Sequence, residues 1–475
     1  MRAAAPKRGP NMVARRPRIR AAQDARKTLG MKELDWKCTP EDALAAWPDA
    51  LPLAALVTGE GHGHHARLSM LAVPAETVEC ATREEALDAL ARAGGDGAGT
   101  WCVAASYELA GAFEPSALPR GRVPDDGWPF ATLVRCGGWL ELDHATGRWT
   151  AHGDAGAATD AVGRALRDGA RGGAPARIDG LEPDLRPGAY ERMVAEAVRL
   201  VHAGDVFQAN VAQRFSARWS GSRRTIMRAA FAAARPRYGA WIESPSRALA
   251  SMSPELFLDV DRASGAVATR PIKGTRAAHQ PVASLMDSEK DAAELHMIVD
   301  LMRNDLGRAC VPGSVRVDVP RALERHETVH HAVAEVRGTL RPGTGLVDLL
   351  RATFPPGSVT GAPKVRAMQV IDALEPCARG PYCGAVGLVS PGRIALNVAI
   401  RTISLAGPDG AGGLLRYPAG CGIVAESDPR QEHEESLHKS AVLVRTALAV
   451  NATGAPRASG PSAPPAPPPC AGAPG

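Results

Sequence analysis

Residues 253–275 read SPELFLDVDRASGAVATRPIKGT, and the pattern of this stretch decides how the rest of the chain is interpreted. Apolar side chains dominate residues 256–260, and residues 266–272 mix β-branched with small side chains. Between them, residues 261–265 are of the small and polar types that form turns. The stretch is therefore predicted to fold as a β-hairpin whose loop is longer than two residues.

The register of this hairpin would bring an acid and an amine together. If the turn centres near Ala263–Ser264, Glu255 faces Lys273 or its immediate neighbour. Directly opposed residues have Cβ atoms about 4.5–5.5 Å apart and point to the same face. Such a pair could act as a proton donor and a nucleophile, or it could be a plain cross-strand ion pair. The spacing leaves both interpretations open.

The composition is that of an ordinary globular protein. The chain has 475 residues, 45% of them hydrophobic and 23% charged, and a formal net charge of +5. This charge is too small to indicate a nucleic acid partner, and the sequence holds no apolar run long enough to cross a membrane. Nine cysteines without a CxxC pair argue against a disulfide framework or a zinc ribbon and favour the cytoplasm.

Both ends of the chain differ from the middle. Residues 1–30 carry nine Lys or Arg against one acidic residue and are expected to be a disordered basic leader. Residues 452–475 are rich in Pro, Ala, Gly and Ser and are expected to be a disordered tail. We expect an N-terminal subdomain over residues 31–150 and a more regular catalytic domain over residues 187–450.

Two predicted helices each carry a pair of carboxylates in their first turns. Ser288 begins one helix with the form of a capping box, and Asp428 begins another. Asp291 and Glu294 share a face of the first helix, as Glu432 and Glu435 do on the second.

Carboxylates grouped on one face repel each other unless a positive charge lies between them. Mg²⁺ takes oxygen ligands of this kind and leaves positions for a substrate. The alternative is that both pairs are solvated charges, placed favourably at helix N-termini.

These segments together resemble the chorismate-utilising enzymes, in particular component I of aminodeoxychorismate synthase and of anthranilate synthase. The resemblance is close over about residues 187–450 and weak over residues 31–149. The resemblance rests on ten sequence motifs that occur in the same order along the chain: GDVFQAN (204–210), SPELFL (253–258), PIKGT (271–275), KDAAELHMIVDLMRNDLGR (290–308), TVHHAV (328–333), FPPGSVTGAPKVRAMQVID (354–372), GAVG (384–387), NVAIRT (397–402), AGCGIVAESDP (419–429) and EHEESLHKS (432–440).

The resemblance implies the roles of the candidate catalytic residues. Aminodeoxychorismate synthases have a lysine in the PIKGT position, whereas anthranilate synthases typically have alanine there. Lys273 is thus the implied nucleophile, Glu255 the general acid and His331 the active-site histidine. Lys273 must attack as a neutral amine and Glu255 must be protonated, so both are expected to be buried. Gln208 stands where isochorismate and salicylate synthases place a lysine, which argues against those activities.

The resemblance also implies how the substrate would be held. Arg401 would pair with the enolpyruvyl carboxylate of chorismate, a task that suits a bidentate guanidinium. Lys439 is a second candidate cation, and the remaining implied contacts come from Thr360, Ala362, Gly420, Gly422 and Gln208. Mg²⁺ would be bound by Glu294 and Glu435, with Asp291 and Glu432 in its outer shell.

The implied fold is α+β, with two antiparallel sheets packed orthogonally and flanked by helices. The implied reaction makes 4-amino-4-deoxychorismate for 4-aminobenzoate and folate. The chain has no Cys-centred glutaminase word, so a separate glutamine amidotransferase subunit is expected to supply ammonia. The alternatives are anthranilate synthase component I and a non-catalytic chorismate-binding protein.

Overall fold

The computed structural model describes residues 31–58, 64–170, 172–325 and 329–453. The predicted leader, and nearly all of the predicted tail, lie outside these residues. Strands and helices are mixed, and every strand pairing among the described residues is antiparallel. This agrees with the predicted α+β class.

The strands of the described residues are β1 (Lys32–Leu34), β2 (Ala54–Val57), β3 (Leu68–Cys80), β4 (Trp101–Ala105), β5 (Ala131–Asp143), β6 (Arg148–Gly153), β7 (Ala176–Pro183), β8 (Gln208–Gly221), β9 (Tyr238–Glu243), β10 (Arg247–Ser253), β11 (Leu256–Asp261), β12 (Ala266–Arg270), β13 (Ile272–Ala277), β14 (Arg316–Arg325), β15 (Val329–Thr339), β16 (Gly361–Ala362), β17 (Ala385–Val389), β18 (Arg393–Val398), β19 (Thr402–Ala406) and β20 (Gly413–Ile423).

The α-helices of the described residues are α2 (Pro40–Ala45), α3 (Arg83–Gly94), α4 (Ala110–Phe113), α5 (Gly156–Asp168), α6 (Ala189–His202), α7 (Arg223–Ala234), α8 (Ala283–Met286), α9 (Glu289–Gly307), α10 (Leu346–Thr353), α11 (Lys364–Leu374) and α12 (Pro429–Thr453). None of them is both long and apolar enough to cross a membrane.

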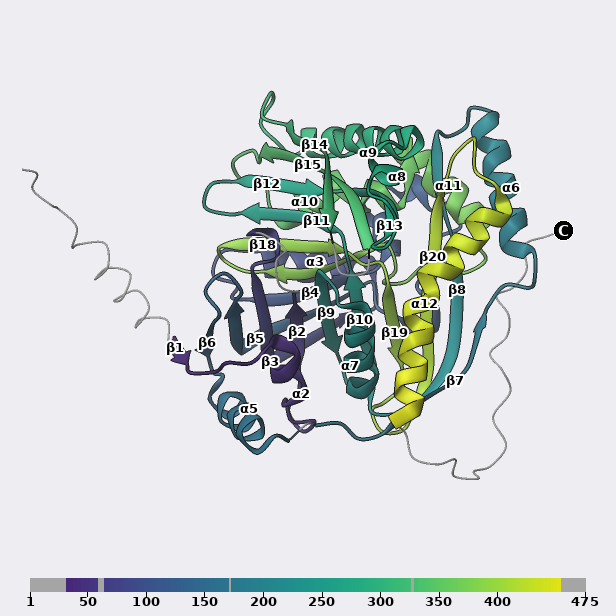
Figure 1. Ribbon diagram of the computed structural model, residues 1–475. Coiled ribbons are helices and arrows are strands. Elements are labelled where there is room, and N and C mark those ends of the chain that lie inside the picture. The colour runs from purple at the N-terminus through teal and green to yellow at the C-terminus, as the bar shows by residue number, and fades with distance from the viewer. Residues whose placement is uncertain (1–30, 59–63, 171, 326–328, 454–475) are drawn as a thin grey trace, which may run out of the picture.

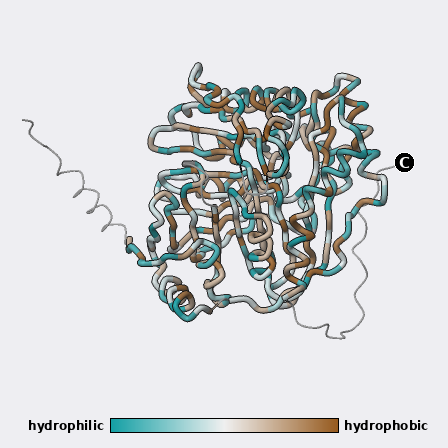
Figure 2. The backbone as a smooth tube through the Cα atoms, in the orientation of Figure 1, coloured by the Kyte–Doolittle hydropathy of each residue, from teal (hydrophilic) through white to brown (hydrophobic). Residues whose placement is uncertain are grey.

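The strands run in two crossing directions. In Figure 1, β11, β12, β14, β15 and β18 run across the view, whereas β8, β9, β10 and β20 run from top to bottom. Strands from the two predicted parts of the chain pair directly, β2 with β9 and β4 with β17. Figure 2 shows hydrophobic residues along the central strands and more hydrophilic ones on the peripheral helices.

Successive side chains of strand β8 point to opposite faces of the sheet. Val211 packs in a buried cluster with Tyr190 of α6, and Phe215 packs in a second cluster that includes residues of α7 and α12. Asn210 and Arg214 point the other way. This alternation leaves a polar face on β8.

The hairpin is present, but its predicted register at the acid and the amine is wrong. Strands β11 and β12 pair from Val260↔Val267 to Leu256↔Arg270, and Pro271 then ends the second strand. Lys273 belongs to β13, which pairs with β15 and not with β11. Because proline has no N–H to donate to the ladder, the pairing is interrupted before it reaches Lys273. Glu255 and Lys273 are therefore not cross-strand partners.

Cysteine chemistry is mixed. Seven cysteines of the described residues are free thiols, and Cys377 is disulfide-bonded. Among the described cysteines, Cys377 is therefore the one that departs from the free thiols found elsewhere.

A buried ion pair holds the segment that leads into α11. The Lys364 ammonium donates to Asp305 Oδ2 at 2.5 Å and to the carbonyls of Thr353 and Pro355 at 2.9 Å each. The Asp305 side chain is 3% exposed, and burial lowers the pKa of Lys364. Lys364, the lysine of the motif SVTGAPK (358–364), therefore fixes the loop between α10 and α11.

Asp305→Ala is expected to destabilise the fold by about 3–5 kcal/mol, because it leaves the ammonium of Lys364 buried without its partner. Urea unfolding measures the loss. Asp300→Ala on the same helix is the matched control: its side chain is 71% exposed and pairs with Arg303, so little change is expected. Equal losses in the two variants would contradict the argument.

Candidate active site

The predicted acid and amine influence each other electrostatically, but not as the cross-strand partners that the hairpin suggested. Glu255 lies between β10 and β11 and is 5% exposed, and Lys273 is half-buried on β13. Burial raises the pKa of Glu255 to about 7, against the opposing effects of the Ser358 hydroxyl, the Lys273 ammonium and the Ile272 N–H. A carboxyl with this pKa is partly protonated at neutral pH and can donate a proton.

The Lys273 amine and the Gln208 side-chain amide both lie close to Gly422. A Cβ atom at this position would lie 2.9 Å from Lys273 Nζ and 2.9 Å from Gln208 Nε2. The Gln208 side chain is fully buried, and neither of its amide atoms has a hydrogen-bond partner in the structure. A buried amide without partners is costly, so the Gln208 side chain is free to bind a ligand beside the amine.

His331 is held next to the strand that carries the amine. Strand β15 pairs with β13 so that His331 lies opposite Thr275, and His331 Nδ1 is 2.8 Å from Thr275 Oγ1. The ring is 2% exposed. This hydrogen bond fixes the orientation of the imidazole.

The segment that follows Thr360 pairs with the strand that begins at Gln208. Strand β16 pairs with β8, with Ala362 opposite Gln208. Gly361 has a φ of 143°, and a Cβ there would lie 2.0 Å from the Gln208 carbonyl oxygen, so only glycine fits. The Thr360 hydroxyl is buried and donates to the carbonyls of Pro356 and Gly357, at 3.2 Å each. Thr360 therefore contributes to this part of the candidate site through its backbone, because its hydroxyl is already hydrogen-bonded.

Arg401 is a cation with no carboxylate in ion-pair range among the residues that the structure describes. It lies between β18 and β19 with a φ of 50°, a conformation that non-glycine residues adopt rarely and that is common at functional sites. Burial lowers the pKa of its guanidinium. An unpaired, half-buried guanidinium is suited to binding an anionic ligand.

Lys439, in contrast, already has partners. Its ammonium donates to the Gly420 carbonyl at 2.8 Å and lies 2.7 Å from Glu435 Oε1. The surrounding anionic groups raise its pKa although burial acts in the opposite direction. A Cβ at Gly420 would lie 2.3 Å from the Val211 carbonyl oxygen, so this glycine lets β20 pack closely on β8.

The four predicted carboxylates lie in one electrostatically coupled region formed by α9 and α12. Both helices begin as predicted: Ser288 accepts from the Asp291 N–H at 3.2 Å, and Asp428 accepts from the Gln431 N–H at 2.9 Å. Burial raises the pKa of Glu294, and the like charges of Asp291 and Glu432 add to this effect against Lys273 and Lys290.

The partners of these carboxylates differ. Asp291 pairs with Arg276 at 2.8 Å, and Glu432 accepts from the Ser427 hydroxyl at 2.7 Å. The pKa of Glu435 is lowered, mainly by Lys439. Glu294 has no ion-pair partner among the described residues. Grouped oxygen donors with a half-buried member that repels its neighbours fit a divalent cation such as Mg²⁺.

Two features of the site were not found from the sequence. Ser358 lies within the word FPPGSVTGAPK and is buried beside Glu255, and Arg276 neutralises Asp291. Neither Ser358 nor Arg276 belongs to a sequence pattern that would mark it as a site residue. Only the three-dimensional arrangement shows their position in the site.

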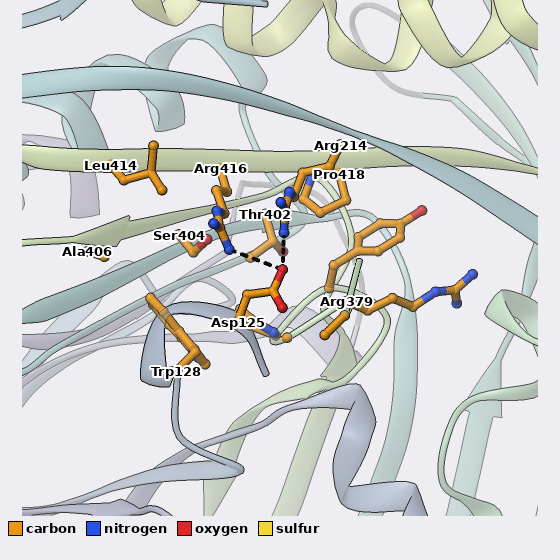
Figure 3. Close-up of a pocket in the computed structure, with 14 residues that line it drawn as sticks. Asp125, Trp128, Arg214, Arg379, Thr402, Ser404, Ala406, Leu414, Arg416 and Pro418 are labelled. Carbon is orange, nitrogen blue, oxygen red and sulfur yellow. Dashed lines mark hydrogen bonds and ion pairs between the residues drawn. The ribbon is translucent and has the colours of Figure 1, made fainter. Parts of the chain in front are cut away.

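A pocket beside Asp125 is a separate feature. Figure 3 shows Asp125 bridging Arg214 and Arg416, with Trp128 and Ser404 nearby. Its volume is ≈ 30 Å³, room for about two water molecules. No predicted site residue lines it.

The chain is similar to known proteins over most of its length. A family model described as chorismate binding enzyme matches residues 53–445. Aminodeoxychorismate synthase component 1 of Salmonella typhimurium is 41% identical over 247 residues, which are 50% of this chain and 53% of that protein. Anthranilate synthase component 1 of Saccharolobus solfataricus is 36% identical over 331 residues, 68% of this chain and 75% of that protein.

A solved structure shows the same architecture. Anthranilate synthase component I from Streptococcus pneumoniae superposes with a TM-score of 0.67 at 28% sequence identity, covering 80% of this chain and 92% of that one. The alignments with the aminodeoxychorismate synthase components span about half the length of those relatives.

Glu255→Gln is expected to change how stability depends on pH. The folded state keeps the Glu255 proton up to about pH 7, against 4.5 for an ordinary glutamate, so the unmodified chain loses stability as the pH rises through this window. A neutral amide avoids that loss. The variant should therefore gain stability relative to the unmodified chain between these pH values, by up to about 3 kcal/mol above pH 7.

Urea unfolding at a series of pH values measures this gain. Glu434→Gln is the matched control, because the Glu434 side chain is 59% exposed, and its difference from the unmodified chain should stay flat. A flat difference for Glu255→Gln would show that the buried carboxyl has an ordinary pKa.

Proposed function

This chain belongs to the chorismate-binding enzyme family, and from that premise we propose that it is component I of an aminodeoxychorismate synthase. It would convert chorismate and ammonia to 4-amino-4-deoxychorismate and water, in the direction of 4-aminobenzoate and folate. The observation that carries the proposal is a lysine amine beside a buried, protonatable carboxyl, Lys273 with Glu255.

The geometry suits a two-step displacement. The neutral Lys273 amine would attack ring carbon 2 of chorismate while Glu255 protonates the departing 4-hydroxyl, which leaves as water. Ammonia would then attack carbon 4, and the bond between the lysine nitrogen and carbon 2 would break. Glu255 would take back a proton from the incoming nitrogen, so the enzyme ends in its starting state.

The remaining residues would bind and orient the substrate. The unpaired guanidinium of Arg401 would hold the enolpyruvyl carboxylate, and Gln208 would use its free amide beside the reacting ring. We propose that Mg²⁺ is held by Glu294 and Glu435, with Asp291 and Glu432 in the outer shell. When bound, it would supply fixed positive charge for the ring carboxylate.

The ammonia donor is a further proposal. Relatives that are named component 1 imply a second component, and we propose a separate glutamine amidotransferase subunit in that role. Free ammonia at high concentration should then replace it in an assay.

The second candidate function is anthranilate synthase component I, because a relative with that name shares 36% identity over 75% of its length. In that reaction, loss of pyruvate gives anthranilate, which is aromatic and fluorescent. The lysine at position 273 favours the first function over this one.

Lys273→Ala should lower the rate of product formation by more than about a thousandfold, roughly 4 kcal/mol of barrier, because the variant has no attacking amine. Purified chain, chorismate, MgCl₂ and an ammonium salt are incubated, and products are separated by chromatography. Lys37→Ala is the matched control, since Lys37 is an exposed lysine of the N-terminal part of the chain. Fluorescent anthranilate as the product, or an active Lys273→Ala variant, would overturn the proposal.

Arg401→Gln should weaken use of chorismate by about tenfold to a hundredfold in kcat/KM, because a hydrogen bond to a charged group contributes about 1.5–3 kcal/mol. The loss should fall mainly on KM, which initial rates at varied chorismate concentration measure. Arg445→Gln serves as the comparison, because Arg445 is exposed and contacts the Ala233 carbonyl. A normal KM for Arg401→Gln would remove Arg401 from the binding site.

A further inference from the structure

Asn210 of β8 carries a buried amide that the sequence did not single out and that the proposed mechanism does not use. Its side chain is 6% exposed. The amide nitrogen Nδ2 is buried and has no hydrogen-bond partner among the residues that the structure describes. A buried donor without a partner costs free energy, so this amide is a candidate for binding a ligand.

The side chain of Asn210 points into the candidate active site. Asn210 lies two residues after Gln208 on the same strand, so both side chains point to the same face. It pairs directly with Gly422 of β20, the glycine that lies close to the Lys273 amine and the Gln208 amide. Gly422 places no side chain beside Asn210, so the Asn210 amide faces the space next to these two groups.

The neighbouring segment places Asn210 near the acid as well. The Asn210 N–H donates to the Thr360 carbonyl at 2.8 Å. Two residues before Thr360 lies Ser358, whose hydroxyl acts on the Glu255 carboxyl. Asn210 therefore stands between the strand position beside the amine and the segment that contacts the acid.

Buried contacts hold the backbone of Asn210 in place. The Arg379 guanidinium donates to the Asn210 carbonyl at 2.6 Å and to the Val359 carbonyl at 3.1 Å. Glu375 accepts from Arg379 at 2.6 Å and from the Ala212 N–H at 2.9 Å. These bonds fix β8 on both sides of the Asn210 side chain and leave its Nδ2 unengaged, which is the arrangement of a preorganised binding group.

The chemistry of the amide indicates which part of the substrate it would bind. Under the proposed function, on which this step rests, Arg401 and the cation hold the two carboxylates of chorismate. The 4-hydroxyl is the neutral ring substituent that Glu255 would protonate, and a neutral amide suits such a group. We propose that Asn210 Nδ2 donates a hydrogen bond to the 4-hydroxyl oxygen of chorismate and holds it beside Glu255.

Two aromatic analogues of chorismate test this contact. The enolpyruvyl ethers of 3-hydroxybenzoate and of 3,4-dihydroxybenzoate, both joined at oxygen 3, carry the same two carboxylates and differ in the 4-hydroxyl. The full-length chain is titrated with each of them in MgCl₂ by calorimetry. The unmodified chain should bind the 4-hydroxy analogue about tenfold more tightly, and in Asn210→Leu this preference should fall to about twofold.

Stability measurements separate a binding role from a structural one. Leucine has nearly the shape of asparagine and removes the unsatisfied donor, so Asn210→Leu should keep or raise the thermal stability followed by circular dichroism. Asn451→Leu is the matched contrast, because the half-buried Asn451 amide bonds to the Ile178 N–H at 2.9 Å and to its carbonyl at 2.7 Å. That variant should lose stability and keep the preference for the 4-hydroxyl.

Asn210→Ala is the second variant and should lose the same preference as Asn210→Leu. An unchanged preference in either folded variant overturns the assignment, and so does an unmodified chain that binds both analogues equally or binds neither. The analogues are already aromatic and are read by binding alone. A chain whose preference depends on Asn210 but which forms no aminated product from chorismate would therefore contradict the proposed function and support this contact.

Discussion

The close approach of β20 to β8 is the constraint on which the site depends. Gly420 and Gly422 lie where any side chain would collide, Gly420 with the backbone of β8 and Gly422 with the Lys273 amine and the Gln208 amide. The two strands stay in register from Gly413↔Trp219 to Ile423↔Ala209. A bare stretch of backbone at the end of this long pairing lets polar side chains from β8 and β13 converge on one point.

Around that point, the acids occupy two different environments. Glu255 is a single buried carboxyl, and burial is the main cause of its raised pKa. Glu294 belongs to a group in which other carboxylates add to the effect of burial. The first environment favours a carboxyl that carries a proton, and the second favours a carboxylate neutralised by a cation. Lys273 interacts with both, so one amine lies between a proton donor and a cation site.

Local chemistry made parts of this arrangement predictable. The helix starts at Ser288 and Asp428 depend only on side chains that cap nearby N–H groups, and both predictions are confirmed. The position of Lys273 depends on pairing with β15, far along the chain, and on the interruption at Pro271. No local pattern encodes that pairing, so the register was wrong there. His331 and Arg401 have no distinctive spacing, and only the resemblance to a known family pointed to them.

The choice of the attacking amine follows from what each lysine already contacts. Lys364 is buried against Asp305 and two carbonyls, and Lys439 is bound to Glu435 and the Gly420 carbonyl. Either would have to break these bonds and lose a proton before it could react. Lys290 is exposed. Lys273 alone combines partial burial, a neighbouring protonatable carboxyl and, among the described residues, no fixed hydrogen bond or ion pair. An amine in that position can approach a substrate carbon without first breaking a contact of this kind.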